Sequence, residues 1–273
     1  MIDYFQYNNG KGIIPEGSIR ISASQMSKFF DSTSQWYRTT LLNIQEEIAN
    51  RTPIELGNCV HAAAAMHFHK LPTDHQAIHN YINSITSPDV DKALILEQYP
   101  PMVEALKSQF LNSTRITESE TFLWQEILPG IGVGGSADAF DSHLGVVYDF
   151  KSTSSKTPPT SFSRAYWFQL MAYAWLYQKL GKPVNYIELI YVTRHETNRI
   201  SETTGKPLKD YPSTVHRIRE VVTPDNLALI ESCIHLIAES VQTWQQRPEL
   251  RYLLAQDYRL RLPTKIIPTI FKD

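Results

Sequence analysis

Hydrophobic residues recur at helical spacing over the first 115 residues of the chain. A helical pattern runs over residues 22–30, with Ser24 as the expected N-cap. The alanine-rich stretch of residues 52–68 predicts a second helix, because alanine has the highest helix propensity. Residues 74–112 predict further helix. Two sequences are expected to interrupt it, Ser87-Pro88 and Pro100-Pro101. Turn signals precede these helices at Asn8-Asn9-Gly10 and Pro15-Glu16-Gly17.

The pattern changes near residue 118, where β-branched and aromatic runs alternate with turn residues. These runs predict strands, and two longer apolar patterns predict helices. The predicted strands are residues 121–127, 132–141, 146–151, 184–193 and 215–222, and the predicted helices are residues 162–180 and a long one that starts at Thr223-Pro224. The order is therefore helices followed by β-β-β-α-β-β-α. It predicts an α/β domain with a central mixed sheet flanked by helices and an N-terminal helical part.

The length of 273 residues is enough for one large domain. We expect a single domain made of a mainly helical part (1–115), an αβ core (116–247) and a C-terminal extension (248–273). No apolar run approaches the roughly 20 residues of a membrane span, and the first residues lack a signal-peptide pattern. The two cysteines, Cys59 and Cys233, have no CxxC partner. These features predict a cytoplasmic protein without a disulfide framework or a structural zinc site.

The formal net charge is −2, which argues mildly against a cationic nucleic-acid binder. Phosphate contacts need only a local patch, however, and the segment from Lys182 to Arg219 has seven cations against four acids, or +3. An ordinary solvated loop explains the same residues equally well.

Two acids and a lysine form the candidate catalytic group. Asp138 and Asp149 lie on consecutive predicted strands joined by a tight turn, so an antiparallel hairpin would bring both carboxylates to one end of the sheet. Asp149 and Lys151 are two residues apart and therefore share a face. Mg²⁺ is held by one or two carboxylates, and a pair of such ions can hydrolyse a phosphodiester. A nearby lysine can orient or deprotonate the attacking water.

These motifs resemble the PD-(D/E)XK nuclease superfamily, and most closely its RecB-type branch with the lambda-type exonucleases and CRISPR-associated nucleases. The likeness spans about residues 20–193. The motifs that carry it are Ser22-Ala23-Ser24, Gly57-x-x-x-His61, Gly135-Ser136-Ala137-Asp138, Asp149-Phe150-Lys151-Ser152-Thr153 and Gln169-x-x-x-Tyr173. The resemblance implies a restriction-endonuclease-like core.

It also implies roles for individual residues. Asp138 and Asp149 would be metal ligands, joined by His61 and by the backbone carbonyl of Phe150, while Lys151 would act on the water. A hydrogen-bonded core histidine is the simpler alternative for His61. Further residues would support the site or lie near DNA: Glu55, Gln169, Tyr173, Ser152, Thr153, Ser155 and Lys156. For Gln169 and Tyr173, helix packing is the alternative.

The expected function is a Mg²⁺- or Mn²⁺-dependent deoxyribonuclease, more specifically an exonuclease of recombination, repair or phage DNA processing. Its partner would be linear duplex or single-stranded DNA, with a homo-oligomer or a recombination protein as further options. Two cysteines cannot hold the iron–sulfur cluster of some RecB-type members, so none is expected. Three alternatives remain: an endonuclease, a non-catalytic protein that binds DNA or a partner, and an unrelated α/β enzyme with a structural Asp149–Lys151 ion pair.

Overall fold

A six-stranded mixed sheet forms the centre of the computed structural model, which describes residues 4–5, 10–44, 49–196, 200–201, 203–247, 249–250 and 254. Its strands are β1 (Ile19–Ser22), β2 (Glu118–Leu128), β3 (Ile131–Asp141), β4 (Val146–Thr153), β5 (Tyr186–Thr193) and β6 (Val215–Val221). The order is β1-β3-β4-β5-β6, and β2 pairs with β3 outside this path. β1–β3 and β4–β5 are parallel, whereas the other pairs are antiparallel.

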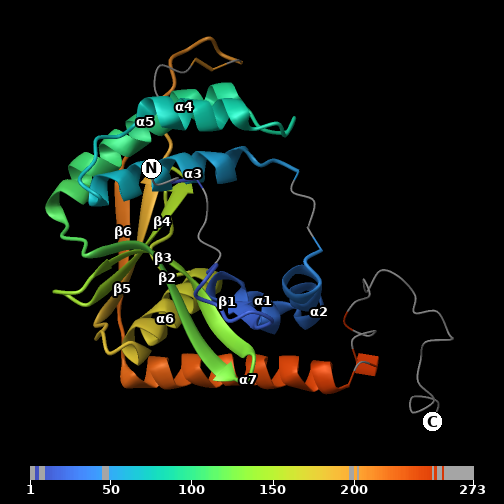
Figure 1. The fold of residues 1–273 in the computed structure, drawn as a ribbon. Helices are drawn as coiled ribbons and strands as arrows, with labels where there is room; N and C mark the ends of the chain where they lie inside the picture. The colour runs from blue at the N-terminus through green and yellow to red at the C-terminus, as the bar shows by residue number, and fades with distance from the viewer. Residues whose placement is uncertain are drawn as a thin grey trace.

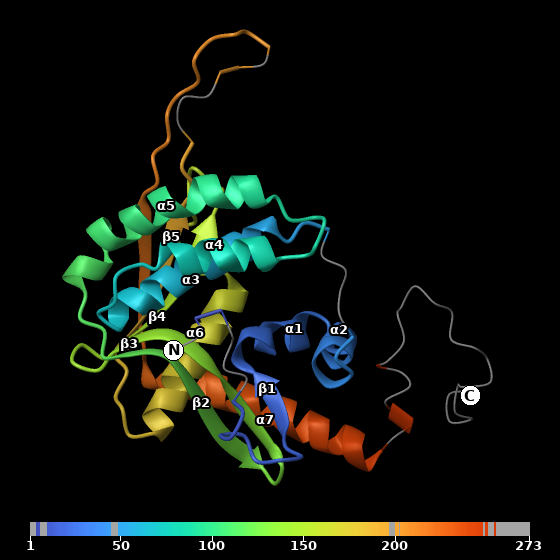
Figure 2. The same cartoon turned by 45° about the horizontal axis from the view of Figure 1, so that its top comes forward.

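Helices cover the sheet in two groups (Figures 1 and 2). The first group is α3 (Thr52–Phe68), α4 (His75–Ser84) and α5 (Lys92–Gln109). The second is α6 (Arg164–Lys179) and α7 (Pro224–Gln246), with α1 (Met26–Asp31) and α2 (Thr33–Trp36) beside them. Short helical turns complete the described chain: η1 (Ala23–Gln25), η2 (Tyr37–Leu41) and η3 (Leu111–Ser113).

Each group of helices encloses a separate hydrophobic core. One core joins α6 and α7 to β1, β3 and α1, and it includes Trp36, Phe140 and Tyr177. The other joins α3, α4 and α5 to β4 and β5, and it includes Phe110 and Phe150. Burying β4 and β5 on both faces explains why their sequences are nearly continuous apolar runs. A charged residue on β4 is therefore placed deep between the two cores.

The predicted α/β class and the order of elements after residue 118 are confirmed. The predicted N-cap of α7 is also present, since the Thr223 side chain accepts a hydrogen bond from the backbone of Asn226. No helix in the described part of the chain has both the length and the apolar character needed to cross a bilayer.

Two local predictions are wrong, and one strand was missed. Strand β1 was not predicted, because its four residues pair only with the distant β3. Ser24 is not an N-cap: it lies inside η1, α1 begins at Met26 without a side-chain cap, and the Ser24 hydroxyl instead bonds the Ser22 hydroxyl. Helix α5 runs through Pro100-Pro101 without ending. Buried side chains in both halves, such as Tyr99 and Met102, hold it as one helix although each proline removes a backbone hydrogen bond.

Some predicted features lie outside the described residues. They are the turn residues Asn8 and Asn9, the charged residues Arg199 and Glu202 of the basic segment, and nearly all of the C-terminal extension.

Candidate active site

The site begins where β3 and β4 stop pairing. Their antiparallel ladder runs from Asp141–Val146 to Ala139–Tyr148. Beyond the Ala139–Tyr148 pair the backbone pairing ends. There the Asp138 carboxylate accepts a hydrogen bond from the Phe150 backbone N–H at 2.7 Å. Asp138 is thereby held beside the residues that follow Tyr148. This contact brings the two predicted acids together, and it argues against the alternative of an isolated structural ion pair.

Asp149 is 1% exposed, and both of its oxygens have a partner. The Lys151 Nζ lies 2.6 Å from Oδ2, and the Gln169 Nε2 donates a hydrogen bond to Oδ1 at 3.0 Å. Burial raises the pKa of Asp149 to about 6; the Lys151 ammonium opposes this rise and the neighbouring Asp138 carboxylate adds to it. Gln169, for which the family resemblance implied a supporting role, thus fixes the orientation of the buried Asp149 carboxylate.

Lys151 carries its charge at neutral pH. Burial lowers its pKa, but the carboxylates of Asp149 and Asp138 outweigh that effect and hold the pKa above its ordinary value. The ammonium also lies 5.3 Å from the centre of the Tyr166 ring. In the metal-free protein, Lys151 is therefore a cation that can donate hydrogen bonds. Loss of its proton would require the neighbouring negative charge to be compensated.

His61 reaches the site from α3, on the opposite side of β4 from α6. Its Nε2 lies 2.8 Å from the carbonyl oxygen of Phe150, and its Nδ1 lies 3.6 Å from an Asp138 oxygen. The helix spacing predicted this inward direction. His61 is hydrogen-bonded, as the core-histidine alternative requires. The two atoms that it contacts, the Phe150 carbonyl oxygen and an Asp138 carboxylate oxygen, are nevertheless atoms to which the family resemblance gives the role of metal ligands.

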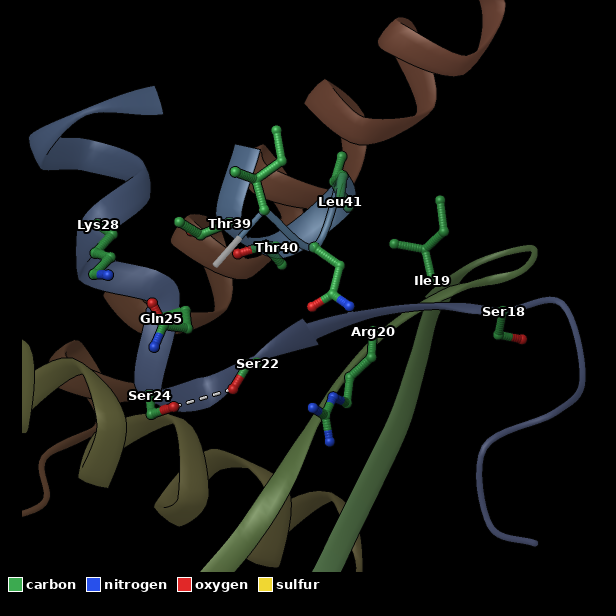
Figure 3. Close-up of a pocket in the computed structure, with 12 residues that line it drawn as sticks. Ser18, Ile19, Arg20, Ser22, Ser24, Gln25, Lys28, Thr39, Thr40 and Leu41 are labelled. Carbon is green, nitrogen blue, oxygen red and sulfur yellow. Dashed lines mark hydrogen bonds between the residues drawn. The ribbon is translucent and has the colours of Figure 1, made fainter. Parts of the chain in front are cut away.

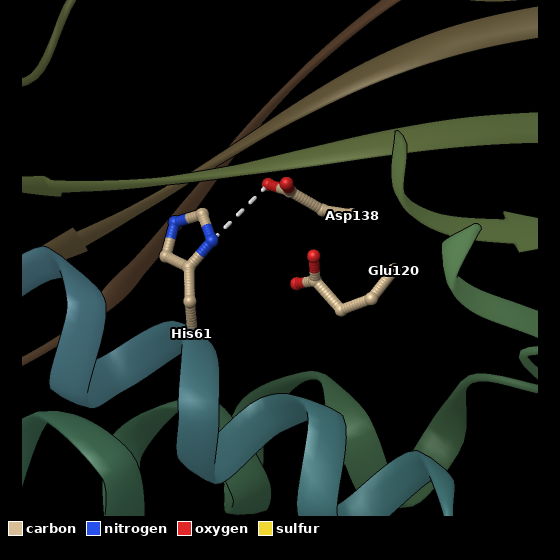
Figure 4. A group of neighbouring side chains, drawn as sticks. All are labelled: His61, Glu120 and Asp138. Atoms are coloured by element: carbon tan, nitrogen blue, oxygen red, sulfur yellow. Dashed lines mark ion pairs between the residues drawn. The ribbon is translucent and has the colours of Figure 1, made fainter. Parts of the chain in front are cut away.

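Glu120 on β2 is a site residue that the sequence analysis missed. Ligand atoms of His61, Glu120 and Asp138 all lie within 4.8 Å of one another, and Figure 4 shows the three side chains pointing toward a common point. Glu120 has a φ of 50°, in the left-handed region that costs a non-glycine residue about 1 kcal/mol or more. The strained backbone is found where a third acidic side chain turns into the site.

The electrostatics of Glu120 reflect its surroundings. Burial, and after it the carboxylates of Asp138 and Asp149, together raise its pKa to about 8 against the opposing effect of Lys151. Such a group keeps its proton at neutral pH unless a cation joins the cluster. Three acids and one imidazole in this space provide the oxygen and nitrogen donors that Mg²⁺ and Mn²⁺ accept.

Only part of the placement of Glu120 could be obtained from the sequence, namely the turn of the β2–β3 hairpin. The β2–β3 hairpin turns at Pro129-Gly130, and its register pairs Thr121 with Ala137 and Ser119 with Ala139. Glu120 therefore falls at the level of Asp138. Counting outward from the turn would have placed Thr121 opposite Asp138; the one-residue irregularity between Glu126 and Leu128, which only the structure shows, places Glu120 there instead.

A cavity of about 260 Å³ is lined by the site residues His61, Glu120, Asp138, Lys151 and Gln169. Tyr173 forms part of its wall, and a Cβ atom at Gly135 would lie 3.0 Å from the Tyr173 hydroxyl. Gly132 and Gly134 lie instead against Trp124 and the β2 backbone. The glycines before Asp138 thus accommodate neighbouring parts of the protein.

The remaining predicted residues are not among those that line this cavity. Glu55 is buried in a network with Arg51, Asn58 and Tyr81, to which it is linked by hydrogen bonds of 2.5–3.1 Å. The Ser152 hydroxyl faces Gly57 of α3, the Thr153 hydroxyl accepts from the backbone of Ser155, and Lys156 pairs with Glu196. Their roles near DNA stay predictions.

Some cations of the basic segment from Lys182 to Arg219 form ion pairs within the protein. Arg217 and Arg219 on β6 both bind the carboxylate of Glu188, which is 1% exposed on β5. Lys182 pairs with Glu118 at 2.5 Å. These three cations therefore compensate acids of the protein itself.

Replacing Gln169 with leucine is expected to lower catalytic activity about 10- to 100-fold, the usual effect of removing a residue that orients a metal-site ligand. The amide that holds Asp149 Oδ1 would be lost while the helix is kept. Turnover of a labelled phosphodiester substrate measures the effect. Gln178→Leu, at an exposed position of the same helix, is the matched control. Equal activity of both variants would contradict the orienting role.

Replacing Glu120 with glutamine is expected to stabilise the metal-free protein at pH 8 but not at pH 4.5. Because the folded protein holds this proton up to about pH 8 and the unfolded chain releases it near pH 4.5, wild-type stability falls as pH rises through that window. The Glu120→Gln variant lacks this pH-dependent loss of stability, because glutamine does not ionise. Melting temperatures in chelator at both pH values measure it.

The control for this comparison is Glu118→Gln, two residues earlier, which changes a carboxylate paired with Lys182. It is not expected to show a gain that grows with pH. A Glu120→Gln melting temperature that follows the wild-type value at both pH values would contradict the raised pKa.

The sequence of residues 20–256 matches the PD-(D/E)XK nuclease superfamily, and this chain belongs to that superfamily. No curated protein matches the chain in sequence. Among solved structures, a "Putative exonuclease" from Eubacterium rectale is similar, with 14% identity, a TM-score of 0.50, and coverage of 86% of this chain and 83% of the other.

Two further structures have lower similarity. A phage related exonuclease from Haemophilus somnus 129PT has 8% identity and a TM-score of 0.43, covering 84% of this chain and 97% of the other. An alkaline exonuclease from Laribacter hongkongensis has 10% identity and a TM-score of 0.36, covering 85% of this chain and 94% of the other. The predicted superfamily and its nuclease fold are thus confirmed.

Proposed function

We propose that this nuclease is a Mg²⁺- or Mn²⁺-dependent deoxyribonuclease that hydrolyses phosphodiester bonds by a two-metal mechanism. The observation that carries the proposal is the cluster of His61, Glu120 and Asp138 beside the buried Asp149–Lys151 pair. The cluster supplies three donor atoms within 4.8 Å of one another, and the adjoining pair supplies a positioned cation. Metal ions held by such donors can activate the attacking water and stabilise the leaving oxygen of a phosphodiester.

Bound cations would supply a more acidic water and neutralise the charge that develops on the phosphate oxygens. His61, Glu120, Asp138 and the Phe150 carbonyl would hold them. The raised pKa of Glu120 means that this residue gives up a proton when a cation binds. Metal affinity should therefore increase with pH up to about pH 8.

The buried pair orients the attacking water. Gln169 holds one oxygen of Asp149 and Lys151 holds the other, so the ammonium is kept at a defined place in the cavity. There it can donate a hydrogen bond to the water or to a phosphate oxygen. Asp149 can join the metal ligands as well, because each carboxylate oxygen has a second lone pair besides the one directed at Lys151 or Gln169.

We place the enzyme among exonucleases of recombination, repair or phage DNA processing, as the resemblance to the lambda-type branch implies. End-labelled linear DNA and a closed circle of the same sequence decide this point. Release of mononucleotides from the linear DNA and survival of the circle are expected with Mg²⁺ or Mn²⁺. Rapid cutting of the circle would favour the endonuclease alternative.

The second candidate is a protein that keeps the fold for binding only. The intact set of donors disfavours it, and calorimetric titration with Mn²⁺ distinguishes the two. A heat of Mn²⁺ binding that the wild type shows and the Asp138→Asn variant lacks supports the enzyme. Absence of binding, together with absence of cleavage, would support the binding protein.

A further inference from the structure

The connection between β5 and β6, residues 194–214, forms an arm that extends past α4 and α5, where Figures 1 and 2 show it in orange. Two antiparallel bridges join its legs, Glu196–Tyr211 and Ile200–Pro207. The bridges are four residues apart on each leg. The described residues of the arm, 194–196, 200–201 and 203–214, therefore belong to a two-stranded ribbon.

Helix α5 holds both legs where they leave the sheet. The buried Gln98 side chain donates a hydrogen bond to the His195 carbonyl at 2.9 Å and accepts one from the His195 N–H at 2.8 Å. Gln109 accepts a hydrogen bond from the Val215 N–H at 2.9 Å. A side-chain amide that uses its donor and its acceptor on one backbone residue fixes the orientation of that residue. The direction of the arm is therefore set by α5.

Strand alternation divides the side chains of the arm between two faces. One face has Ile200 and Pro207 near the tip and then, toward the sheet, Lys209 and Tyr211. The Lys209 ammonium lies 5.4 Å from the centre of the Tyr211 ring, as this placement requires. Leu208 falls on the other face. Because the exposed Ile200 and Leu208 lie on opposite faces, they do not form the single apolar patch that a protein partner would need.

The chemistry of the tip suits duplex DNA instead. Lys206 and Lys209 are exposed, and neither ammonium has an acidic partner among the described residues. Lysines are common contacts of backbone phosphates, and apolar side chains such as isoleucine and proline are used against bases in a groove. A two-stranded ribbon also has the width that a groove of B-DNA admits.

The arm begins next to the catalytic group. Lys151 on β4 pairs with Tyr191 on β5, and three residues later the Arg194 N–H bonds the Thr153 carbonyl at 2.9 Å. Ile200 follows Tyr191 by nine residues. At about 3.3 Å per residue, the tip therefore lies at most about 30 Å from the level of Lys151. At about 3.4 Å per base pair, this is the length of roughly nine base pairs.

On its opposite side the catalytic cavity adjoins a groove. Arg20, Ser22 and Ser24 line both the cavity and this groove, which has a volume of about 700 Å³ and lies between β1, the start of α1 and residues 39–44 (Figure 3). In the sheet, β1 lies on the other side of β3 and β4 from β5. A cavity of about 260 Å³ encloses only a small part of a DNA chain, and DNA that leaves it on the β5 side reaches the arm.

We propose that the arm grips the duplex part of the DNA substrate, up to roughly nine base pairs from the cut. Lys206 and Lys209 bind backbone phosphates, and Ile200 and Pro207 lie against the bases in a groove. The inference rests on the proposed nuclease function, and it adds a second contact surface that recognises double-stranded DNA.

Binding of fluorescent stem–loop DNA, measured by anisotropy in chelator to prevent cleavage, tests the proposal. One DNA has a stem of about 20 base pairs, and the other has a stem of about 4, too short to reach the lysines. The double variant Lys206→Gln/Lys209→Gln is expected to weaken binding of the long stem about 10-fold and to reduce the salt slope by about two. Ile200→Ser should weaken it about 3- to 10-fold without changing the salt slope, because no charge is lost. Neither variant should change binding of the short stem.

The matched control is Lys179→Gln/Lys182→Gln, which removes the same charge at the other end of β5. Lys179 ends α6, and both lysines are paired with acids, Glu231 and Glu118. This variant should bind both stems as wild type does. The proposal is overturned if the arm variants bind the long stem like wild type, if they lose equal affinity for both stems, or if the control loses as much.

Hydrolysis of bis(p-nitrophenyl) phosphate with Mn²⁺ separates this inference from the proposed function, because that substrate is too small to reach the arm. The arm variants should keep this activity, which also shows that they fold. If the wild type binds the stems in the expected way but hydrolyses nothing, the nuclease function fails and the arm assignment stands. If it hydrolyses the small substrate but the length-dependent binding is absent, the arm assignment fails alone. Self-association that Ile200→Ser abolishes, with DNA binding unchanged, would assign the arm to contacts between copies of the chain and overturn the proposal.

Discussion

Lys151→Met is expected to lower DNA cleavage about 10³-fold, within the range for loss of a group that assists proton transfer. Methionine keeps the length of the side chain but removes the ammonium 2.6 Å from Asp149. The pKa of Asp149, already about 6 because of burial, should then rise further, since Lys151 is the strongest of the influences that lower it. Residual activity should shift to higher pH, because Asp149 would ionise later. Initial rates between pH 6 and 9 measure both effects.

Lys179→Met is the control for that variant. Lys179 lies at the end of α6 and pairs with Glu231 on the surface, away from the cavity. Its loss should leave both the rate and the pH profile unchanged. An unaltered rate in Lys151→Met would end the assignment of the catalytic group.

Asp138→Asn should have an effect of similar size by a different route. The asparagine oxygen can still accept the hydrogen bond from Phe150, so the hairpin should stay folded, but one negative ligand of the cluster is lost. We expect Mn²⁺ affinity to fall more than 10-fold and cleavage about 10³-fold, which corresponds to about 4 kcal/mol of lost transition-state stabilisation. Calorimetry and cleavage rates measure the two effects on the same preparation.

Asp141→Asn is a chemically identical substitution three residues along β3. Asp141 is also buried, and its carboxylate accepts from the backbone of His143 and Leu144 in the next turn, outside the cluster. This variant should bind Mn²⁺ as wild type does. Equal metal affinity of the two variants would show that Asp138 is not a ligand.

Strand alternation and a tight turn were sufficient to predict which residues of the hairpin would gather. Asp149 and Lys151 share a face because successive side chains in a strand point to opposite sides. The turn between β3 and β4 brings Asp138 to their level. Helical spacing likewise predicted that His61 would point inward. These features depend on neighbours in sequence, and periodicity reports them reliably.

Glu120 and β1 were not predicted, for reasons that lie outside local sequence. Glu120 enters the site only through a shifted register in β2 and a left-handed backbone conformation that packing must stabilise. β1 exists because Ile19–Ser22 finds a partner in β3, more than 100 residues later. Neither the register shift in β2 nor the pairing of β1 with β3 changes the hydrophobic periodicity of the sequence.

The chain's own pattern was thus enough to specify the α/β class and the acid–acid–lysine group, because alternation and turns are local properties, while the nuclease fold came from the resemblance of the motifs to a known superfamily. Folding in three dimensions decided the third acid, the contact of Gln169 with Asp149, and the groove between β1 and residues 39–44. Those contacts join segments far apart in sequence, and their geometry follows from how the two cores pack on the sheet rather than from any single stretch of residues.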